Sequence, residues 1–277
     1  MSAAAAAYQA RPRRRWIWVV VALVTAVALV VPVAFRIALK GDIRHQIVPL
    51  TLIQQPISGI QVDAPGQSVT VLRGRPGQVS VLSDVSWLLG RPAIRHAWHG
   101  RILRLSASCP AFNVFGDCQV GLVIRVPAGV QVQVAVGSGS AALAGLTGPV
   151  HVTASSGSIS LTDISGPLWA AATSGTVIAT SGLTSARVVA AVSSGRMALG
   201  FAQPPEALAL KVGSGSAAVT VPPGGRYRIS GERGSGTLQV GPGLGDSGAA
   251  RFITAVLGSG HVAIGYLQLA PSAPLAS

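Results

Sequence analysis

The sequence predicts an all-β fold, namely a β-solenoid with coils of about 20 residues, preceded by one N-terminal transmembrane helix. Two observations predict it. Between residues 138 and 260, seven Ser-Gly dipeptides each stand at the centre of a strand-turn-strand pattern. Residues 16–35 are a run of twenty residues without a charge. A near-constant period is typical of stacked repeats, and an uncharged run of this length is typical of a membrane span.

The uncharged run, WIWVVVALVTAVALVVPVAF, would cover the roughly 30 Å of a bilayer core as a helix. Residues 1–15 form a basic segment that ends in RPRRR, and the positive-inside rule keeps such a segment in the cytoplasm. We therefore expect a single-pass signal-anchor in the cell membrane with an extracytoplasmic C-terminal domain. The alternative is a cleaved signal peptide, whose apolar region is usually only about 7–15 residues long.

Three further segments follow the predicted anchor. Residues 36–55 have mixed charges and no clean period, which predicts a linker. Residues 56–267 alternate in hydropathy and are expected to form the β-solenoid domain, with residues 56–130 as distorted opening coils. The stack is expected to close near Tyr266 and Leu267, and residues 268–277 are expected to be a disordered tail.

The Ser-Gly copies read as strands with tight turns. In one copy, Val150 and Val152 precede the dipeptide and Ile159 and Leu161 follow it, each alternating with polar residues. We expect the glycines to adopt the positive φ that turns require and the serine hydroxyls to bond to backbone. The predicted turn residues are Ser138, Gly139, Ser156, Gly157, Ser174, Gly175, Ser194, Gly195, Ser214, Gly215, Ser235, Gly236, Ser259 and Gly260.

The two cysteines of the chain, Cys109 and Cys118, flank the short segment PAFNVFGD. A disulfide is expected if the domain lies outside the cytoplasm, and two free thiols are the alternative. A metal site is not indicated, because no histidine or third cysteine lies at ligand spacing in this segment.

The net charge is +13, of which the 15 basic and 8 acidic residues after Lys40 contribute +7. A solvated face is the favoured interpretation, and a weak patch for anionic polymer or lipid headgroups is the alternative. Nucleic-acid binding is not indicated, because aromatic residues do not alternate with the basic ones. The basic residues that gather early in the domain are Arg73, Arg75, Arg91, Arg95, Arg101 and Arg104.

One locally dense cluster, Arg95-His96-Ala97-Trp98-His99, interrupts the regular pattern. We expect an irregular segment here that packs Trp98 on the end of the stack, and a binding spot is the alternative.

The repeat resembles the bacterial putative adhesin family, which consists of exported or membrane-anchored β-solenoid domains. The resemblance rests on VPAGVQVQVAVGSGS at residues 126–140 and on the turns LTGP at 146–149 and ISGP at 164–167. It covers about residues 56–267 and implies an extracytoplasmic domain without an assigned activity. Many members carry Asp after the Ser-Gly, and this chain instead has Ser140, Ser158, Thr176, Arg196, Ser216, Thr237 and His261.

Catalysis is not indicated, and no cofactor is expected. Enzymes built on β-solenoids need carboxylates grouped on one face, and the acids of the repeats, Asp163, Glu206, Glu232 and Asp246, occupy different offsets from the Ser-Gly. A nucleophilic serine needs an adjacent base, and the only histidines in the repeats are His151 and His261.

The sequence therefore predicts a non-enzymatic binding, adhesion or envelope-sensing module of the cell envelope, with a glycan, a lipid or a protein as its partner. The alternative is a carbohydrate-active β-helix enzyme. A third hypothesis is a scaffold subunit that assembles through the open edge of its sheets.

Overall fold

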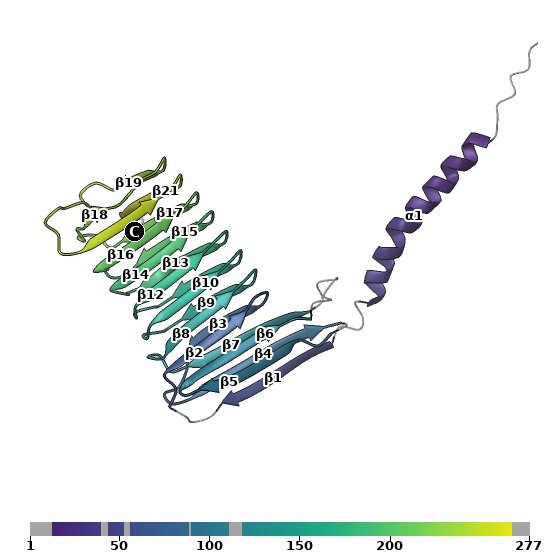
Figure 1. Ribbon diagram of the computed structural model, residues 1–277, viewed down its shortest axis with the longest axis horizontal. Helices are drawn as coiled ribbons and strands as arrows, with labels where there is room; N and C mark the ends of the chain where they lie inside the picture. The colour runs from purple at the N-terminus through teal and green to yellow at the C-terminus, as the bar shows by residue number, and fades with distance from the viewer. Residues whose placement is uncertain (1–12, 40–43, 53–55, 89, 111–117, 268–277) are drawn as a thin grey trace, which may run out of the picture. The chain divides into compact units, whose positions relative to one another are not determined.

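The structure is a computed structural model that describes residues 13–39, 44–52, 56–88, 90–110 and 118–267. It divides into two compact units, residues 1–44 and 45–277. The expected tail at 268–277 and most of the expected cytoplasmic segment lie outside the described residues. The fold is all-β apart from one N-terminal helix (Figure 1).

The helix α1 spans Arg13–Leu39 and is apolar over most of its length. Its window Trp16–Ala34 has a mean hydropathy of 2.8, and none of that window is buried in the protein. By length and composition α1 is able to cross a membrane, and a signal sequence would share both properties.

Two sheets account for the remaining described elements. Sheet A has the strand order β1-β4-β7-β3-β9-β11-β13-β15-β17-β21-β19, and sheet B has the order β18-β20-β16-β14-β12-β10-β8-β2-β6-β5. The strands are β1 (Arg44–Leu52), β2 (Gly59–Ala64), β3 (Ser68–Arg73), β4 (Val79–Trp87), β5 (Ala93–His99), β6 (Ile102–Ser108), β7 (Gln119–Val126), β8 (Gln131–Val136), β9 (Ser140–Ala144), β10 (Val150–Ala154), β11 (Ser158–Thr162), β12 (Leu168–Ala172), β13 (Thr176–Leu183), β14 (Arg187–Val192), β15 (Arg196–Phe201), β16 (Ala207–Val212), β17 (Ser216–Val221), β18 (Arg228–Ser230), β19 (Thr237–Val240), β20 (Phe252–Leu257) and β21 (His261–Tyr266).

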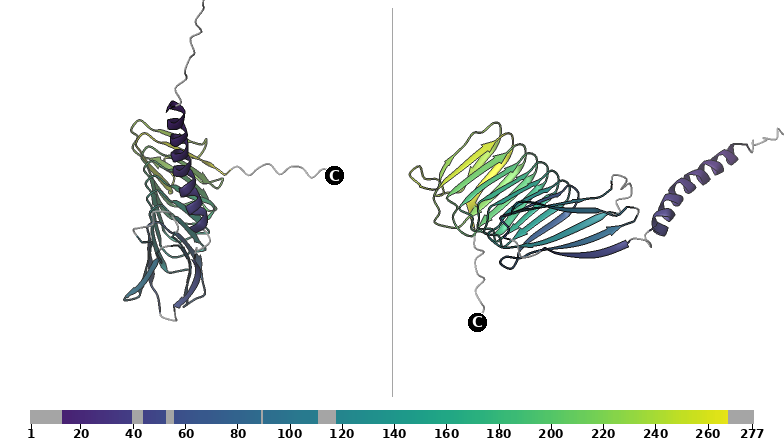
Figure 2. Two further views of the ribbon diagram at one scale, coloured as in Figure 1. Left: turned by 90° about the vertical axis from the view of Figure 1, so that its right-hand side faces the viewer. Right: turned by 60° about the horizontal axis from the view of Figure 1, so that its bottom comes forward.

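Each Ser-Gly copy contributes one strand to each sheet, and equivalent strands pair in parallel. In sheet A, Ser158 of β11 lies opposite Ser140 of β9 on one side and Thr176 of β13 on the other. In sheet B, Val150 of β10 lies between Val132 and Leu168. The register between these strands therefore equals the sequence spacing of the copies, so equivalent residues lie side by side across each sheet. The strands of successive copies are stacked next to one another (Figure 2).

The alternation of apolar residues places one side of every strand pair in the interior. Val152, Ile159 and Leu161 are each at most 1% exposed, and the inward residues of both sheets form one continuous core. Burying one such side chain contributes roughly 1.5–3 kcal/mol. No single copy encloses its apolar side chains, so each depends on its neighbours in the stack.

The order of the strands departs from the order of the chain at both ends of the stack. The last copy, β20 and β21, lies between the β16–β17 and β18–β19 copies, because His261 pairs with both Ser216 and Thr237. Likewise β6 and β7 lie outside β2 and β3. The expectation that the stack closes near Tyr266 and Leu267 is thus wrong, and the short strands β18 and β19 form that edge instead.

The first third of the domain contains antiparallel pairs that the sequence pattern did not reveal. β4 pairs with β7, and β5 pairs with β6, both in antiparallel register. The segment Arg95–His99, expected to be irregular, lies within the regular strand β5, where Trp98 is 36% exposed. Its alternation is hidden because both faces of this edge strand carry polar or exposed side chains.

The segment 36–55, interpreted as a linker, contains the strand β1. β1 occupies the edge of sheet A next to β4. An edge strand tolerates Pro49, which lacks a backbone N–H, and it does not need a regular apolar alternation. This explains why the sequence pattern indicated no strand.

Candidate functional site

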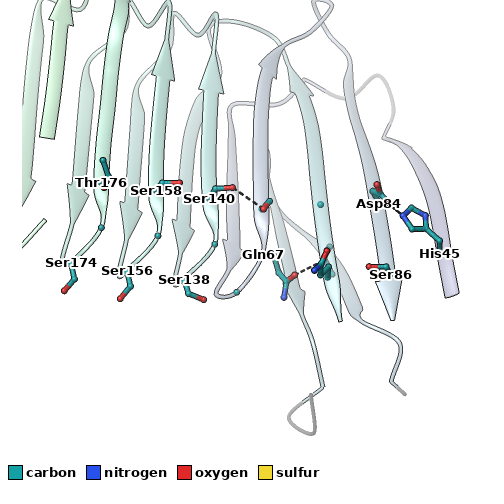
Figure 3. A pocket seen from close by; sticks show the side chains of 18 residues that line it. His45, Gln67, Asp84, Ser86, Ser138, Ser140, Ser156, Ser158, Ser174 and Thr176 are labelled. Atoms are coloured by element: carbon teal, nitrogen blue, oxygen red, sulfur yellow. Dashed lines mark hydrogen bonds and ion pairs between the residues drawn. The ribbon is translucent and has the colours of Figure 1, made fainter. Parts of the chain in front are cut away.

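An open groove crosses the ends of seven neighbouring strands of sheet A, and we call it the polar groove. It has a volume of about 790 Å³ and runs from His45 of β1 to Thr176 of β13 (Figure 3). Neighbouring strands lie about 4.8 Å apart, so the groove is about 29 Å long. The hydroxyl-bearing residues that line it are Ser68, Ser86, Ser138, Ser140, Ser156, Ser158, Ser174 and Thr176.

The Ser-Gly corners form one wall of the groove, and the glycines are there because successive corners touch. A Cβ on Gly157 would overlap the carbonyl oxygen of Gly139, and a Cβ on Gly175 would overlap that of Gly157, in each case well inside 3.0 Å. None of the seven glycines predicted at these corners has a positive φ. The expectation of a positive φ is therefore wrong, and close backbone approach between stacked corners is the reason for glycine.

Backbone hydrogen bonds continue the ladder through these corners. The N–H of Ser174 donates to the carbonyl oxygen of Ser155 at 2.8 Å, and the N–H of Thr176 donates to Gly157 at 3.2 Å. The backbone hydrogen-bond pattern of the corners is therefore as regular as that of the strands, and successive copies are closely spaced there. This regularity places equivalent side chains in line along the groove.

The serine hydroxyls face solvent and do not cap the backbone. Ser138, Ser156 and Ser174 are exposed, and among the described residues their side chains form no hydrogen bond. In Figure 3 they project in the same direction, one from each corner. A second row follows the dipeptide, where the Ser140 hydroxyl donates to the Ser68 hydroxyl at 3.1 Å. The expectation that the corner hydroxyls bond to backbone is not met in this part of the chain.

A buried amide fixes the floor of the groove near its N-terminal end. The side chain of Gln67 is only 7% exposed. Its Oε1 accepts the N–H of Val120 at 2.8 Å, and its Nε2 donates to the Sγ of Cys109 at 3.3 Å. Gln67 therefore connects the corner before β3 to β7 and to the disulfide.

The predicted disulfide between Cys109 and Cys118 is confirmed, with a Cα–Cα distance of 6.0 Å. It joins the end of β6 to the start of β7, so it closes the segment that leads from sheet B to sheet A at this end of the groove.

One acid–base pair lies at the same end of the groove. The Nε2 of His45 is 3.3 Å from Oδ1 of Asp84, and both side chains are more than half exposed. Within the described part of the chain, no serine hydroxyl bonds to His45. The groove thus contains a histidine–carboxylate pair without the activated nucleophile that hydrolysis by serine requires.

The sequence interpretation missed His45, Asp84 and Gln67. His45 was assigned to a linker, and Asp84 comes near it only through the antiparallel course of β4. No local motif marks either residue. Gln67 occupies the corner position that Gly139 holds in the next copy, since a Cβ on Gly139 would overlap the carbonyl oxygen of Gln67. Aligning the sequence around Gln67 with the Ser-Gly copies, so that Gln67 matches Gly139, could have identified Gln67.

The later Ser-Gly dipeptides continue the corner wall beyond the groove. Ser194, Ser214 and Ser259 are exposed, and the Ser259 hydroxyl donates to the Ser214 hydroxyl at 3.1 Å because the last copy lies next to β17. Arg196 interrupts the second row of hydroxyls, which ends in a 2.6 Å contact between Thr237 Oγ1 and His261 Nδ1.

A second cavity, of about 870 Å³, lies near the other end of the stack and contains both Glu206 and Asp246. These acids were expected to lie apart, and the displaced position of the last copy brings them to one cavity. Oδ2 of Asp246 is 3.5 Å from Arg226, and its Oδ1 accepts the N–H of Gly248 at 2.9 Å. Asp246 therefore orders its own loop and is poorly placed to serve as a free catalytic acid.

Groups of His, Cys, Asp and Glu that could hold a metal ion do not occur within the described ranges.

A scan of known protein families finds no match to this chain. A search of curated proteins finds no similar sequence either.

Solved structures do resemble the chain. A putative cell adhesion protein from Clostridium sporogenes ATCC 15579 aligns over 81% of this chain and 100% of its own, with 10% identity and a TM-score of 0.38. A putative adhesin from Bacteroides fragilis NCTC 9343 aligns over 80% and 97%, with 13% identity and a TM-score of 0.40. A putative lipid binding protein from Parabacteroides distasonis ATCC 8503 aligns over 82% and 98%, with 12% identity and a TM-score of 0.33. Two of these structures are putative adhesion proteins of bacteria, the kind of protein that the repeat resembles.

Proposed function

We propose that the two sheets are the walls of one β-solenoid, held outside the cell membrane by α1, and that this domain is a non-enzymatic binding module for an envelope glycan. The polar groove is the proposed binding site. In this arrangement residues 45–267 are the extracytoplasmic domain, and α1 is a single-pass anchor with its N-terminus in the cytoplasm.

The observation that supports this proposal is the chemistry of the groove lining. Its side chains are hydroxyls, the amides of Gln67 and Gln119, and the single pair His45–Asp84. Among the described residues that line it, Val120 is the only large apolar side chain, and Lys and Arg are absent. Such a lining does not suit a lipid tail or a polyphosphate, and it matches a neutral polymer whose own hydroxyl and amide groups both donate and accept.

The shape of the groove favours a polymer over a small molecule. It is open along its length, and from β3 through β9 and β11 to β13 its hydroxyls recur once per strand, about every 4.8 Å. Each hydroxyl contributes roughly 0.5–1.5 kcal/mol when it replaces water with a ligand group. Affinity therefore requires several contacts along an extended chain, which an envelope glycan offers.

The test is co-sedimentation of the full-length protein, solubilised in detergent, with purified peptidoglycan sacculi. Removing two hydroxyls by the double change Ser156→Ala and Ser174→Ala is expected to weaken binding by about 1–3 kcal/mol, or roughly 5- to 150-fold. The matched control is Ser194→Ala with Ser214→Ala, which removes the same groups from corners beyond the groove. Equal binding by both double variants and the unchanged protein would contradict the proposed site.

A carbohydrate-active enzyme remains the second candidate, because His45 and Asp84 lie at the end of a groove of glycan-binding chemistry. Asp84→Asn and His45→Gln would both abolish turnover of the sacculi if the pair were catalytic. We expect neither change to alter the release of soluble sugar, because no release is expected from the unchanged protein.

A further inference from the structure

The N-terminal edge of the stack is basic. Between Asp84 and Asp117 the sequence contains no acidic residue, and the same stretch contains the arginines 91, 95, 101 and 104. The sequence alone does not show where this segment lies in the fold, and its position comes from the structure.

This acid-free stretch forms the outermost strand of sheet B and its flanks. β5 pairs with β6 on one side only, so its other backbone edge is unpaired among the described strands. Arg95 lies within β5, and Arg91 and Arg101 lie just beyond its two ends. We call β5 with Arg91 and Arg101 the basic edge.

The arginines of the basic edge are positioned without being neutralised. Nη2 of Arg91 donates to Oε1 of Gln46 at 3.2 Å, and its guanidinium lies 5.6 Å from the ring centre of Trp87. Nε of Arg101 donates to the carbonyl oxygen of Pro56 at 3.0 Å. None of the ion pairs found in the described part of the chain involves these residues. Their positive charges are therefore available to a partner.

The edge also carries exposed aromatic and imidazole groups. Trp98 is 36% exposed, and His96 and His99 are exposed on the same strand. Arg95 and Trp98 are three positions apart in β5, so their side chains lie on opposite faces of the strand. An exposed indole is suited to the headgroup layer of a bilayer, where its apolar body and its N–H are both accommodated. A second copy of the chain is a poorer partner for this edge, because two such edges would repel each other.

The connection to α1 is short enough for the domain to reach the bilayer. Four residues, 40–43, separate the end of α1 from the start of β1, and five residue steps span at most about 18 Å. β1 is the outermost strand of sheet A, as β5 is of sheet B. If α1 is an anchor, its tether therefore leads to the same end of the stack that carries the basic edge.

We infer that the basic edge binds the anionic headgroups of the membrane in which α1 is anchored. This inference rests on the proposed anchoring role of α1. Docking of this edge would direct the long axis of the stack away from the bilayer and leave the Ser-Gly corners accessible to the envelope.

The test uses the full-length protein in nanodiscs of phosphatidylcholine, with or without phosphatidylglycerol. A photo-crosslinking amino acid replaces His99 in β5, or Lys211 in β16 as the distant control. We expect lipid crosslinks from position 99 in the anionic discs, with little from position 211, and we expect added salt to reduce them.

Charge variants make the test specific to the edge. Arg95→Gln with Arg101→Gln should reduce the crosslink yield at position 99 by about fivefold for each arginine. Arg187→Gln with Arg228→Gln removes the same charge from β14 and β18, strands of sheet B that lie far from β5, and should leave the yield unchanged. Circular dichroism of each variant would show whether the fold is retained.

The outcomes separate the two proposals. Release of the unchanged protein from membranes by carbonate would show that α1 is no anchor and would overturn both. Retention in the membrane with equal crosslinking at positions 99 and 211, or with no dependence on phosphatidylglycerol, would overturn the headgroup inference alone. Preferential capture of added heparin over lipid would also overturn it, since the edge would then recognise a soluble anionic polymer.

Discussion

The close contact between successive corners makes Gly175 the most informative position for a substitution. Adding a single methyl group by Gly175→Ala would place a Cβ on the carbonyl oxygen of Gly157. The same oxygen accepts the N–H of Thr176. The two corners would have to separate, and the hydrogen bonds between them would lengthen or break.

The expected cost follows from these two effects. Overpacking in a site that cannot relax costs about 1–3 kcal/mol, and each disrupted backbone hydrogen bond adds about 0.5–1.5 kcal/mol. Gly175→Ala should therefore lower the free energy of unfolding by about 2–5 kcal/mol. For a domain of this size, that corresponds to a fall in Tm of about 5–20 °C.

Two glycines serve as matched controls in the same domain. Gly265 has no atom within 4 Å of an added Cβ and no positive φ, so Gly265→Ala should be neutral or slightly stabilising. Gly77 is equally open but has a φ of 73°, so Gly77→Ala should cost about 1–2 kcal/mol from backbone strain alone.

The assay is thermal and urea unfolding of the full-length protein followed by circular dichroism. The order of destabilisation should be Gly175→Ala, then Gly77→Ala, then Gly265→Ala. Ser174→Ala, which removes an exposed hydroxyl, should change the stability by less than about 0.5 kcal/mol. A Gly175→Ala variant as stable as the Gly265→Ala variant would refute the reasoning that stacked corners exclude any side chain.

Four further substitutions test other parts of the domain. Cys109→Ser should lower the free energy of unfolding by about 2–3 kcal/mol through loss of the short closed loop, and two thiols that react in the native, unreduced protein would contradict this. Burial lowers the pKa of His151, which stacks on Trp169 at 3.9 Å. Because the unfolded chain then binds a proton at this histidine more readily than the folded chain, the free energy of unfolding should decrease as the pH falls below about 6.5. A His151→Gln variant should lack this decrease. Burial raises the pKa of Tyr227 to about 12, and its hydroxyl is buried without a hydrogen-bond partner among the described residues, so Tyr227→Phe should be neutral or stabilising. By contrast, Tyr266→Phe should lower the free energy of unfolding by about 1 kcal/mol, because the Tyr266 hydroxyl reaches the carbonyl oxygens of Gly225 and Gly243 at 3.0 Å. A larger loss of stability for Tyr227→Phe than for Tyr266→Phe would contradict these hydrogen-bond assignments.

The repeated part of the domain was predictable because its information is local. Alternation around each Ser-Gly gives strand positions, and the constant period gives the parallel register, as the pairing of Ser158 with Ser140 and Thr176 shows. The disulfide was predictable for the same reason, since Cys109 and Cys118 are close in the sequence.

The reason for the glycines was not predictable from one copy. A turn glycine ordinarily indicates a positive φ, and within one corner nothing distinguishes that explanation from a close approach. The contact between Gly175 and Gly157 belongs to two copies at once. It becomes visible only when the copies are stacked.

The ends of the stack were not predictable from the period either. Sequence order suggests that the last copy is the outermost, but His261 pairs with Ser216 of an earlier copy and leaves β19 at the edge. The antiparallel strand β4, which brings Asp84 to His45, is a similar case. Such pairings join strands that are far apart in the sequence. They depend on which sheet edge is unpaired when the later strand joins the sheet, and the alternation of apolar residues alone does not specify that edge.

The claim that the polar groove binds a glycan is tested most directly in intact cells. A photo-crosslinking amino acid at Ser156, inside the groove, is compared with one at Lys211, on the outer face of sheet B. The proposed function predicts that position 156 captures material rich in sugar and that position 211 captures much less. Equal capture at the two positions, or capture of protein without sugar at position 156, would contradict it.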